Sequence, residues 1–289
     1  MTPVRPLAAS RRGALGLLAA APLTVLASRS PRAAPPPGWH LAFDEPFDRL
    51  DLGGRWEPHY PEGWRTNAGN RELEYYVDPR PGQDPEVLRP LHPFHLGDGV
   101  LRIRANPVPE AMQRATLGLP YASGLLTTYR SFAFRYGYAE MRARVPRGRG
   151  LWPAFWLLAR AGGWPPEIDV MEVYGDRLTT LDLTLHTGAD GGHRQRKRQH
   201  PVPDLSGDFH TYAVTWTRET VAWAFDGETV FSEPTPADLH QPMFLLVNLA
   251  VGGTWTGAPD AATAFPADFA IDRIRVFTPE PTGTGGIGE

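Results

Sequence analysis

The sequence predicts an all-β protein built from many short strands. From residue 39 onward, short apolar or alternating stretches are separated by turns, and no long segment repeats its apolar residues at the helical period of 3.6. The chain contains nine Trp, nine Tyr and thirteen Phe in 289 residues, and aromatic side chains favour strands. It contains no cysteine, so no disulfide stabilises this fold.

Residues 1–37 differ in character from the rest of the chain. An arginine pair at 11–12 precedes an apolar stretch at 14–26, and small residues and a proline-rich linker follow. This order is typical of a secretory signal, and the arginine pair resembles a twin-arginine export signal. The apolar stretch is too short to be a good membrane span. We therefore expect an exported protein, periplasmic or extracellular, with one domain at 38–278 and a flexible tail at 279–289.

The expected strands follow one another through this domain. Residues 99–105 alternate apolar and polar side chains, as a half-buried strand does. Residues 209–216 and 221–228 are expected to form a hairpin with an Asp-Gly turn. Further strands are expected at 41–48, 123–128, 134–145, 151–158, 181–186, 244–251 and 269–277. Loops are expected at 78–93, 106–120 and the arginine-rich 190–200.

One stretch places three carboxylates among large apolar residues. Residues 167–172 read Glu-Ile-Asp-Val-Met-Glu and follow two prolines, which argue against a helix interior. A strand places Glu167 and Asp169 on one face, whereas a helix would point them to nearly opposite sides. One extra residue, a β-bulge near 170–171, would return Glu172 to that face. Two carboxylates about 5–5.5 Å apart are what retaining glycoside hydrolysis requires. Alone, the hexapeptide would equally fit an ordinary strand with solvated acids.

The hexapeptide resembles the catalytic signature of glycoside hydrolase family 16, in the bulged form typical of its laminarinase-like, endo-β-1,3-glucanase branch. Residues 67–76 resemble the Asn-Asn-Glu-Leu-Gln-Tyr-Tyr segment of that branch. The resemblance covers roughly 39–277. It implies a concanavalin A-like β-jelly-roll sandwich with a sugar-binding cleft across its concave sheet. Other matching segments lie at 41–48, 123–128, 134–145, 148–158, 244–255 and 269–277.

Spacing and resemblance together suggest roles for the three acids. Glu167 would be the nucleophile that attacks the anomeric carbon. Glu172 would be the general acid and then the base, and Asp169 would orient Glu167. One glutamate must be ionised while the other is protonated, so their surroundings must separate the two pKa values.

Several other residues are candidates for sugar binding. Trp152 and Trp156 are four residues apart, so a strand places both on one face, where they either pack in the core or form the floor of a sugar site. The resemblance implies that Asn70 hydrogen-bonds a sugar on the non-reducing side of the cleavage point, although Asn also often caps a turn. His186 is expected either to reach the acids from a neighbouring strand or to be structural. Trp255 is expected to close one end of the cleft.

The sequence also limits cofactors and partners. Relatives often bind a structural calcium ion through an Asp in the closing strand, which makes Asp272 a candidate, although calcium takes six to eight oxygen ligands. The nine His show no His-Glu-Xaa-Xaa-His spacing, which argues against zinc hydrolysis. We expect no cofactor in catalysis. A net charge of −3 gives no pull toward nucleic acid, and we expect a monomer that binds a polysaccharide.

The function predicted from the sequence is therefore a secreted, retaining endo-hydrolase of β-1,3- or mixed β-1,3/1,4-glucan. Leu125 stands where many laminarinase-like enzymes have an arginine, so another substrate, such as an exopolysaccharide or a galactan, stays open. The cations at 190–200 would suit an acidic polymer. A transglycosylase is a further alternative. A non-catalytic carbohydrate-binding sandwich is the other class of function, but it has no need for three acids on one face.

Overall fold

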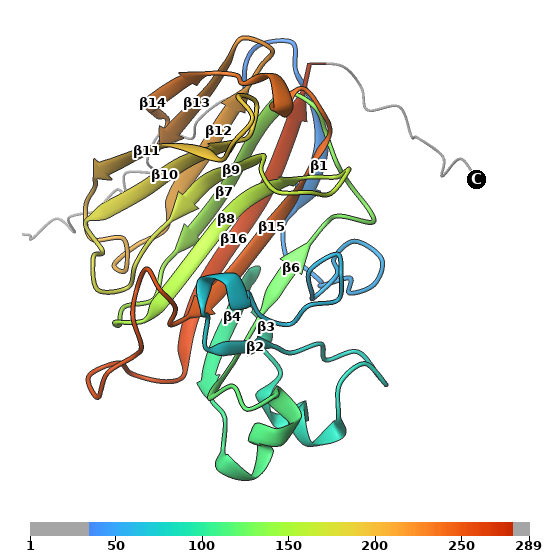
Figure 1. The fold of residues 1–289 in the computed structure, drawn as a ribbon, viewed down its shortest axis with the longest axis vertical. Coiled ribbons are helices and arrows are strands. Elements are labelled where there is room, and N and C mark those ends of the chain that lie inside the picture. Colours follow the sequence, from blue (N-terminus) through green and yellow to red (C-terminus); the bar gives the residue numbers. More distant parts are fainter. Residues whose placement is uncertain (1–34, 280–289) are drawn as a thin grey trace, which may run out of the picture. The chain divides into compact units, whose positions relative to one another are not determined.

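The computed structural model describes residues 35–279 (Figure 1). These residues form two sheets, as expected for an all-β sandwich. The proposed export signal and linker fall almost entirely on residues 1–34, and most of the predicted tail falls on residues 280–289. Both stretches lie outside the described residues. Among the described residues, no helix combines the length and the apolar character needed to cross a membrane.

The smaller sheet has six strands and contains the acid-bearing stretch. All of its neighbouring strands are antiparallel. Figure 1 shows β9, β8 and β15 lying next to one another within it. Its order is β11 (Arg194–Pro201), β10 (Thr180–Thr187), β9 (Glu167–Glu172), β8 (Leu151–Ala159), β15 (Met243–Val251) and β6 (Leu125–Thr127).

The larger sheet has ten strands. Its main order is β14 (Glu228–Pro234), β13 (Thr220–Phe225), β12 (His210–Trp216), β7 (Gly137–Arg144), β16 (Ala267–Thr278), β4 (Val100–Pro107), β5 (Tyr121–Ser123) and β2 (Glu74–Tyr76). In addition, β1 (His40–Glu45) pairs with β16, and β3 (Phe94–Gly97) pairs with β4. Short 3₁₀ helices occur at Ala68–Asn70, Glu86–Leu91, Glu110–Thr116 and Ala237–Leu239.

The main core lies between the two sheets. One buried cluster contains Phe155 and Ile168 from the six-stranded sheet together with Met141 and Ile274 from the ten-stranded sheet. Because side chains alternate along a strand, the residues between these core positions in β8 and β9 point to the opposite, outer face of the six-stranded sheet. Each fully buried large apolar side chain contributes roughly 1.5–3 kcal/mol to folding.

Two local predictions were wrong. The arginine-rich stretch predicted to be a loop forms β11, an edge strand whose eight residues pair with β10. The Asp-Gly turn at 226–227 does not join the predicted hairpin, because it connects β13 to β14, a strand that the sequence analysis did not identify. Asp226 and Gly227 both have positive φ, 47° and 95°, as a tight hairpin turn requires.

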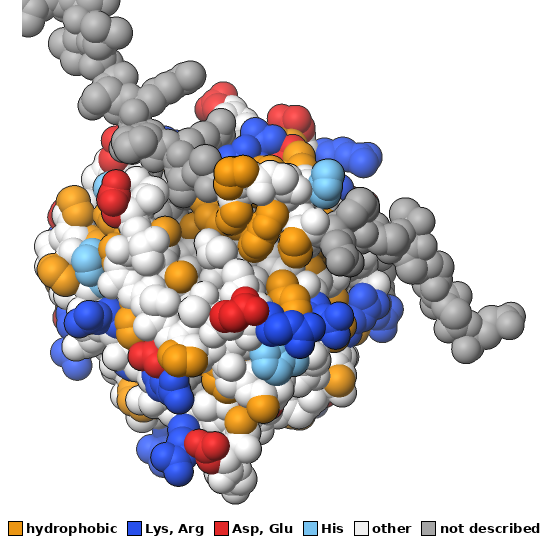
Figure 2. Space-filling model, turned by 90° about the horizontal axis from the view of Figure 1, so that it is seen from above, with side chains coloured by type: hydrophobic (Ala, Val, Ile, Leu, Met, Phe, Trp, Pro, Cys, Tyr) orange, Lys and Arg blue, Asp and Glu red, His pale blue; other side chains and the backbone are white. Residues whose placement is uncertain are grey.

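Charges of both signs are distributed over the surface. On the face seen in Figure 2, Lys and Arg side chains lie close to Asp and Glu side chains, and apolar patches lie among them. On the ten-stranded sheet, ion pairs join Arg104 to Asp268 and Arg273 to Asp44.

Candidate active site

The predicted bulge in β9 is confirmed by its pairing with both neighbouring strands. Ala154 of β8 lies opposite Glu172, and Trp156 lies opposite Asp169, so two steps along β8 match three steps along β9. The register with β10 shifts at the same place. The extra residue places Ile168, Val170 and Met171 in the core and leaves the three acids together on the outer face.

Glu172 lies in a buried setting with two hydrogen-bond donors. The indole N–H of Trp152 donates to Oε1 at 3.1 Å, and the hydroxyl of Thr184 donates to Oε2 at 3.3 Å. Burial raises the pKa of Glu172 to about 7, while the positive charge of Lys197 opposes this and the negative charge of Glu167 adds to it. Such a carboxyl is partly protonated near neutral pH, so it suits both an acid and a base.

Glu167 begins β9 and receives one short hydrogen bond. The indole N–H of Trp164 donates to its Oε2 at 2.6 Å. Burial and the charge of Asp169 raise the pKa of Glu167 well above its usual value, whereas His186 and the bond from Trp164 act in the opposite direction. The ionised form of Glu167 therefore depends on these stabilising neighbours.

Asp169 lies between the two glutamates and contacts His186. The distance from His186 Nε2 to Asp169 Oδ2 is 3.2 Å, and Asp169 also interacts with Glu167 through a side-chain hydrogen bond. Burial raises the pKa of Asp169 and lowers that of His186. These two pKa shifts favour a neutral imidazole on His186 and an Asp169 carboxyl that shares a proton. Three ionised acids so close together would repel one another. His186 thus reaches the acids from a neighbouring strand, the first of the two expected alternatives, and its part in sugar binding stays a prediction.

Trp152 and Trp156 lie on the same face of β8, as predicted, and both support the site through their N–H groups. Trp152 bonds Glu172 directly, and the N–H of Trp156 donates to Asn248 Oδ1 at 2.8 Å. Asn248 in turn donates to the hydroxyl of Tyr76 at 2.9 Å. Trp152 is only 7% exposed, so its polar contact with Glu172 is clearer than a role as an open sugar platform. Direct sugar contacts of either tryptophan stay predictions.

Asn70 and Trp255 lie in neighbouring turns. The backbone N–H of Thr254 donates to the carbonyl of Asn70 at 2.8 Å, which places the turn bearing Trp255 beside the Asn70 turn. The side chain of Asn70 donates to Glu72 Oε1 at 2.9 Å, whereas the capping role in this turn belongs to Asn67. Trp255 is 58% exposed, which leaves its ring available to a ligand. The sugar contacts of Asn70 and Trp255 stay predictions.

Leu125 is fully buried on the outer side of the six-stranded sheet. It lies opposite Asn248 in β15 and belongs to a small cluster that includes Tyr60, Tyr76 and Phe244. An apolar residue at this position completes a packed aromatic layer beside Trp156. The site therefore lacks the cation that an arginine here would bring.

Three residues near the acids were missed by the sequence analysis. Trp164 contacts Glu167, Thr184 contacts Glu172, and His193 contacts His186 at 2.9 Å between their ring nitrogens. The only available signal for Trp164 was its position three residues before the first acid. His193 is seven residues from His186, and only the pairing of β10 with β11 brings them together.

The surroundings of Asp272 do not fit the predicted calcium site. Its carboxylate is ion-paired with Arg142 at 2.9 Å, and Arg273 follows it in the chain. A calcium ion takes six to eight oxygen ligands and would compete with that arginine. Among residues 35–279, only Glu167, Asp169 and His186 bring three ligand atoms of this kind within 4.8 Å of one another. The contact of Asp169 with His186 and its hydrogen bond with Glu167 account for that closeness.

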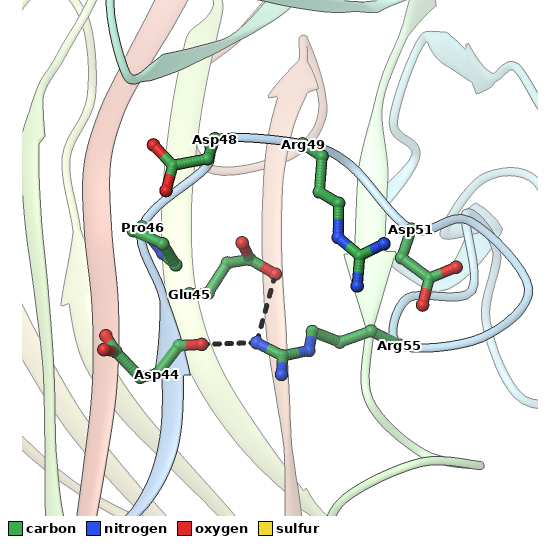
Figure 3. A pocket seen from close by; sticks show the side chains of 7 residues that line it. All are labelled: Asp44, Glu45, Pro46, Asp48, Arg49, Asp51 and Arg55. Carbon is green, nitrogen blue, oxygen red and sulfur yellow. Dashed lines mark hydrogen bonds and ion pairs between the residues drawn. The ribbon is translucent and has the colours of Figure 1, made fainter.

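The pocket in Figure 3 is not part of this site. It lies at the end of β1, which belongs to the ten-stranded sheet, and three of its charged groups, Asp44, Glu45 and Arg55, already have partners. Arg55 contacts Glu45 and the carbonyl of Asp44, and the Asp44 carboxylate pairs with Arg273. The residues lining it are Asp44, Glu45, Pro46, Asp48, Arg49, Asp51 and Arg55.

A Trp152→Phe substitution is expected to raise the pKa of Glu172 by roughly one unit, because the lost N–H bond favours the ionised carboxylate. An NMR titration of the glutamate side-chain carboxyls measures this. Trp156→Phe is the matched control, since its indole donates to Asn248 and its loss should leave Glu172 unchanged. Equal titration of Glu172 in the wild type and Trp152→Phe would contradict this account of the site.

Comparisons with known proteins agree with the geometry. The family model described as glycosyl hydrolases family 16 matches residues 101–272. An endo-1,3-1,4-beta-glycanase, EglC, from Rhizobium meliloti (strain 1021) is 42% identical over 243 residues, which cover 82% of this chain and 51% of that protein. The chain thus spans about half the length of that relative. A beta-glucanase from Rhodothermus marinus is 33% identical over 274 residues, covering 86% of this chain and 88% of that protein. The X-ray structure of the laminarinase from Rhodothermus marinus aligns with a TM-score of 0.70 and 32% identity, covering 83% of this chain and 97% of that one.

Proposed function

The chain belongs to glycosyl hydrolases family 16, and from this premise we propose that it is an exported, retaining endo-hydrolase of β-1,3- or mixed β-1,3/1,4-glucan. The observation that carries the proposal is the bulged strand β9, which brings Glu167, Asp169 and Glu172 to one face. The relative from Rhodothermus marinus that is named a beta-glucanase supports the choice of glucan, and the endo-1,3-1,4-beta-glycanase supports the linkages.

The first step would form a covalent glycosyl-enzyme intermediate. A carboxylate oxygen of Glu167 attacks the anomeric carbon and forms a carbon–oxygen bond. The bond from that carbon to the leaving sugar breaks, and the leaving oxygen takes the proton of Glu172. The pKa of about 7 gives Glu172 its proton below neutral pH, where the step requires it.

The second step would restore the enzyme. Glu172, now a carboxylate, takes a proton from a water molecule as the water oxygen bonds the anomeric carbon. The ester bond to Glu167 breaks and its carboxylate is released. Two displacements at one carbon return the original anomeric configuration. No cofactor is needed for either step.

Asp169 and His186 would share a proton beside Glu167 and so influence the charge of its carboxylate. Their atoms lie 3.2 Å apart, and Asp169 also contacts Glu167. A proton shared within this group lowers the repulsion that an ionised Glu167 would otherwise meet, and it fixes the carboxyl orientation. We propose that this pair acts on Glu167 and does not react itself.

A second substrate class is favoured by two observations. Leu125 is apolar and buried, and the edge strand β11 is rich in cations, of which Lys197, opposite Thr184, lies on the face of the acids, while Arg194, Arg196 and Arg198 lie on the opposite face. Part of this charge is neutralised, because Arg196 pairs with Glu233 and Lys197 with Asp182. An acidic exopolysaccharide cleaved by the same machinery is therefore the second candidate, and a neutral galactan is a weaker one.

A panel of polysaccharides tests the proposal. We expect oligosaccharides from laminarin, curdlan or lichenan, and we expect proton NMR to show the newly formed reducing end first as the β-anomer, as retention requires. Activity confined to an acidic exopolysaccharide or to agarose would keep the chemistry and change the substrate. An α-anomer as the first product would contradict double displacement. Binding of a polymer without any cleavage would favour a carbohydrate-binding sandwich instead.

A further inference from the structure

Trp164 is a largely exposed tryptophan whose polar end contacts the site. Its side chain is 55% exposed, yet its indole N–H donates to Glu167 Oε2 at 2.6 Å. An indole N–H donates one hydrogen bond and the ring offers no acceptor, so Trp164 interacts with Glu167 only as a donor. Bonds to an ionised carboxylate are shorter and stronger than those between neutral groups. The hydrogen bond from Trp164 therefore stabilises the charged form of Glu167 more than its neutral form.

Two histidines support the indole ring from the side. The ring centroid of Trp164 lies 4.5 Å from that of His193 and 5.6 Å from that of His186. The two imidazoles stack on each other at 5.1 Å with an interplanar angle of 17°. His186 also contacts Asp169, so the wall formed by Trp164, His186 and His193 reaches two of the three acids.

The loops that carry this wall are fixed by packing. Gly162 and Gly163, just before Trp164, have φ values of 80° and 84°, which only glycine adopts readily. A Cβ at Gly188, in the β10–β11 turn, would lie 3.2 Å from Pro165, so the two loops pack closely. Asp238 holds that turn by accepting the N–H of Gly188 at 2.7 Å. Trp164 is thus placed by two loops that meet beside β9.

We propose that Trp164 is a positioning residue for the nucleophile: its indole N–H holds Glu167 Oε2, orients the carboxylate and supports the charge needed for attack. The inference rests on the proposed role of Glu167. Burial and the charge of Asp169 both oppose ionisation of Glu167, so the indole N–H acts together with His186 in favouring the charged carboxylate, and it is the group that bonds Oε2 directly.

Trp164→Phe tests the N–H group separately from the aromatic ring, because phenylalanine keeps an aromatic face and lacks the donor. On the most active polymer of the panel, kcat is expected to fall roughly 10- to 100-fold, while KM stays within about twofold. Trp64→Phe is the matched control, since Trp64 is similarly exposed, at 64%, and is expected to change neither constant. An unchanged kcat, or a higher KM with normal kcat, would overturn the proposal.

A second measurement does not depend on activity. In the nitrogen-15 NMR spectrum of the full chain, the indole signal missing from Trp164→Phe identifies Trp164. We expect this signal to move in Glu167→Gln, because a neutral amide replaces a charged acceptor. A Trp164 signal that is the same in the wild type and in Glu167→Gln would overturn the hydrogen bond and the proposal with it. If the bond is seen but Glu167→Gln stays active, the proposed function fails instead.

Discussion

Replacing Glu167 by glutamine is expected to lower kcat by roughly 10⁴-fold or more, with little change in the fold. An amide cannot form the ester bond to the anomeric carbon, so double displacement stops at its first step. The substitution keeps the size of the side chain, and its carbonyl oxygen can still accept the N–H of Trp164. Reducing-sugar release from the active polymer measures the loss.

The stability of this variant separates chemistry from folding. Because folding raises the pKa of Glu167, protonation of this residue stabilises the folded state. That contribution is fully present below the usual pKa of a glutamate, and it is lost as pH rises toward the higher pKa of the folded state. The Tm of Glu167→Gln at neutral pH should therefore equal or exceed that of the wild type. Glu74→Gln is the matched control, a buried glutamate outside β9, and should keep activity. Near-normal activity in a folded Glu167→Gln would contradict its role as nucleophile.

The bulge in β9 could be predicted because one physical conflict requires it. Ile168, Val170 and Met171 all need burial, and three acids all need the opposite face, so a regular strand cannot satisfy residues 167–172. The family resemblance pointed to the same solution. For His186, the alternation of side chains left two alternatives, an approach to the acids or a structural role, and only the register that pairs it with Glu167 shows that it lies beside them.

What the sequence missed has a common cause, which is contact between distant parts of the chain. Arg142, which pairs with Asp272, lies 130 residues earlier, so the sequence did not show that this candidate calcium ligand is ion-paired. The stretch that forms β11 looks polar and loop-like because it is an edge strand whose side chains are mostly exposed. Trp164 gains its role only where its loop meets the β10–β11 turn. The sequence also could not assign pKa values, because burial and neighbours decide them.

Replacing Glu172 by glutamine is expected to lower activity by an amount that depends on the leaving group. On polysaccharide, kcat should fall roughly 10²- to 10⁴-fold, because the departing sugar oxygen receives no proton. On an aryl glycoside with an acidic phenol as leaving group, the first step needs no acid, so the glycosyl-enzyme should form and accumulate. Added azide, a nucleophile that needs no base, should then speed turnover and give a β-glycosyl azide.

The pH profile gives the same assignment independently. In the wild type, activity should fall as pH rises through about 7, because Glu172 loses the proton that it must donate. In Glu172→Gln, acting on the activated glycoside, that basic limb should be absent. Trp156→Phe is the control that should retain it, since Trp156 contacts Asn248 and not Glu172. A basic limb that persists in Glu172→Gln, or a variant that azide does not accelerate, would assign the proton to another group. Asp169 would then be the next candidate, because burial also raises its pKa.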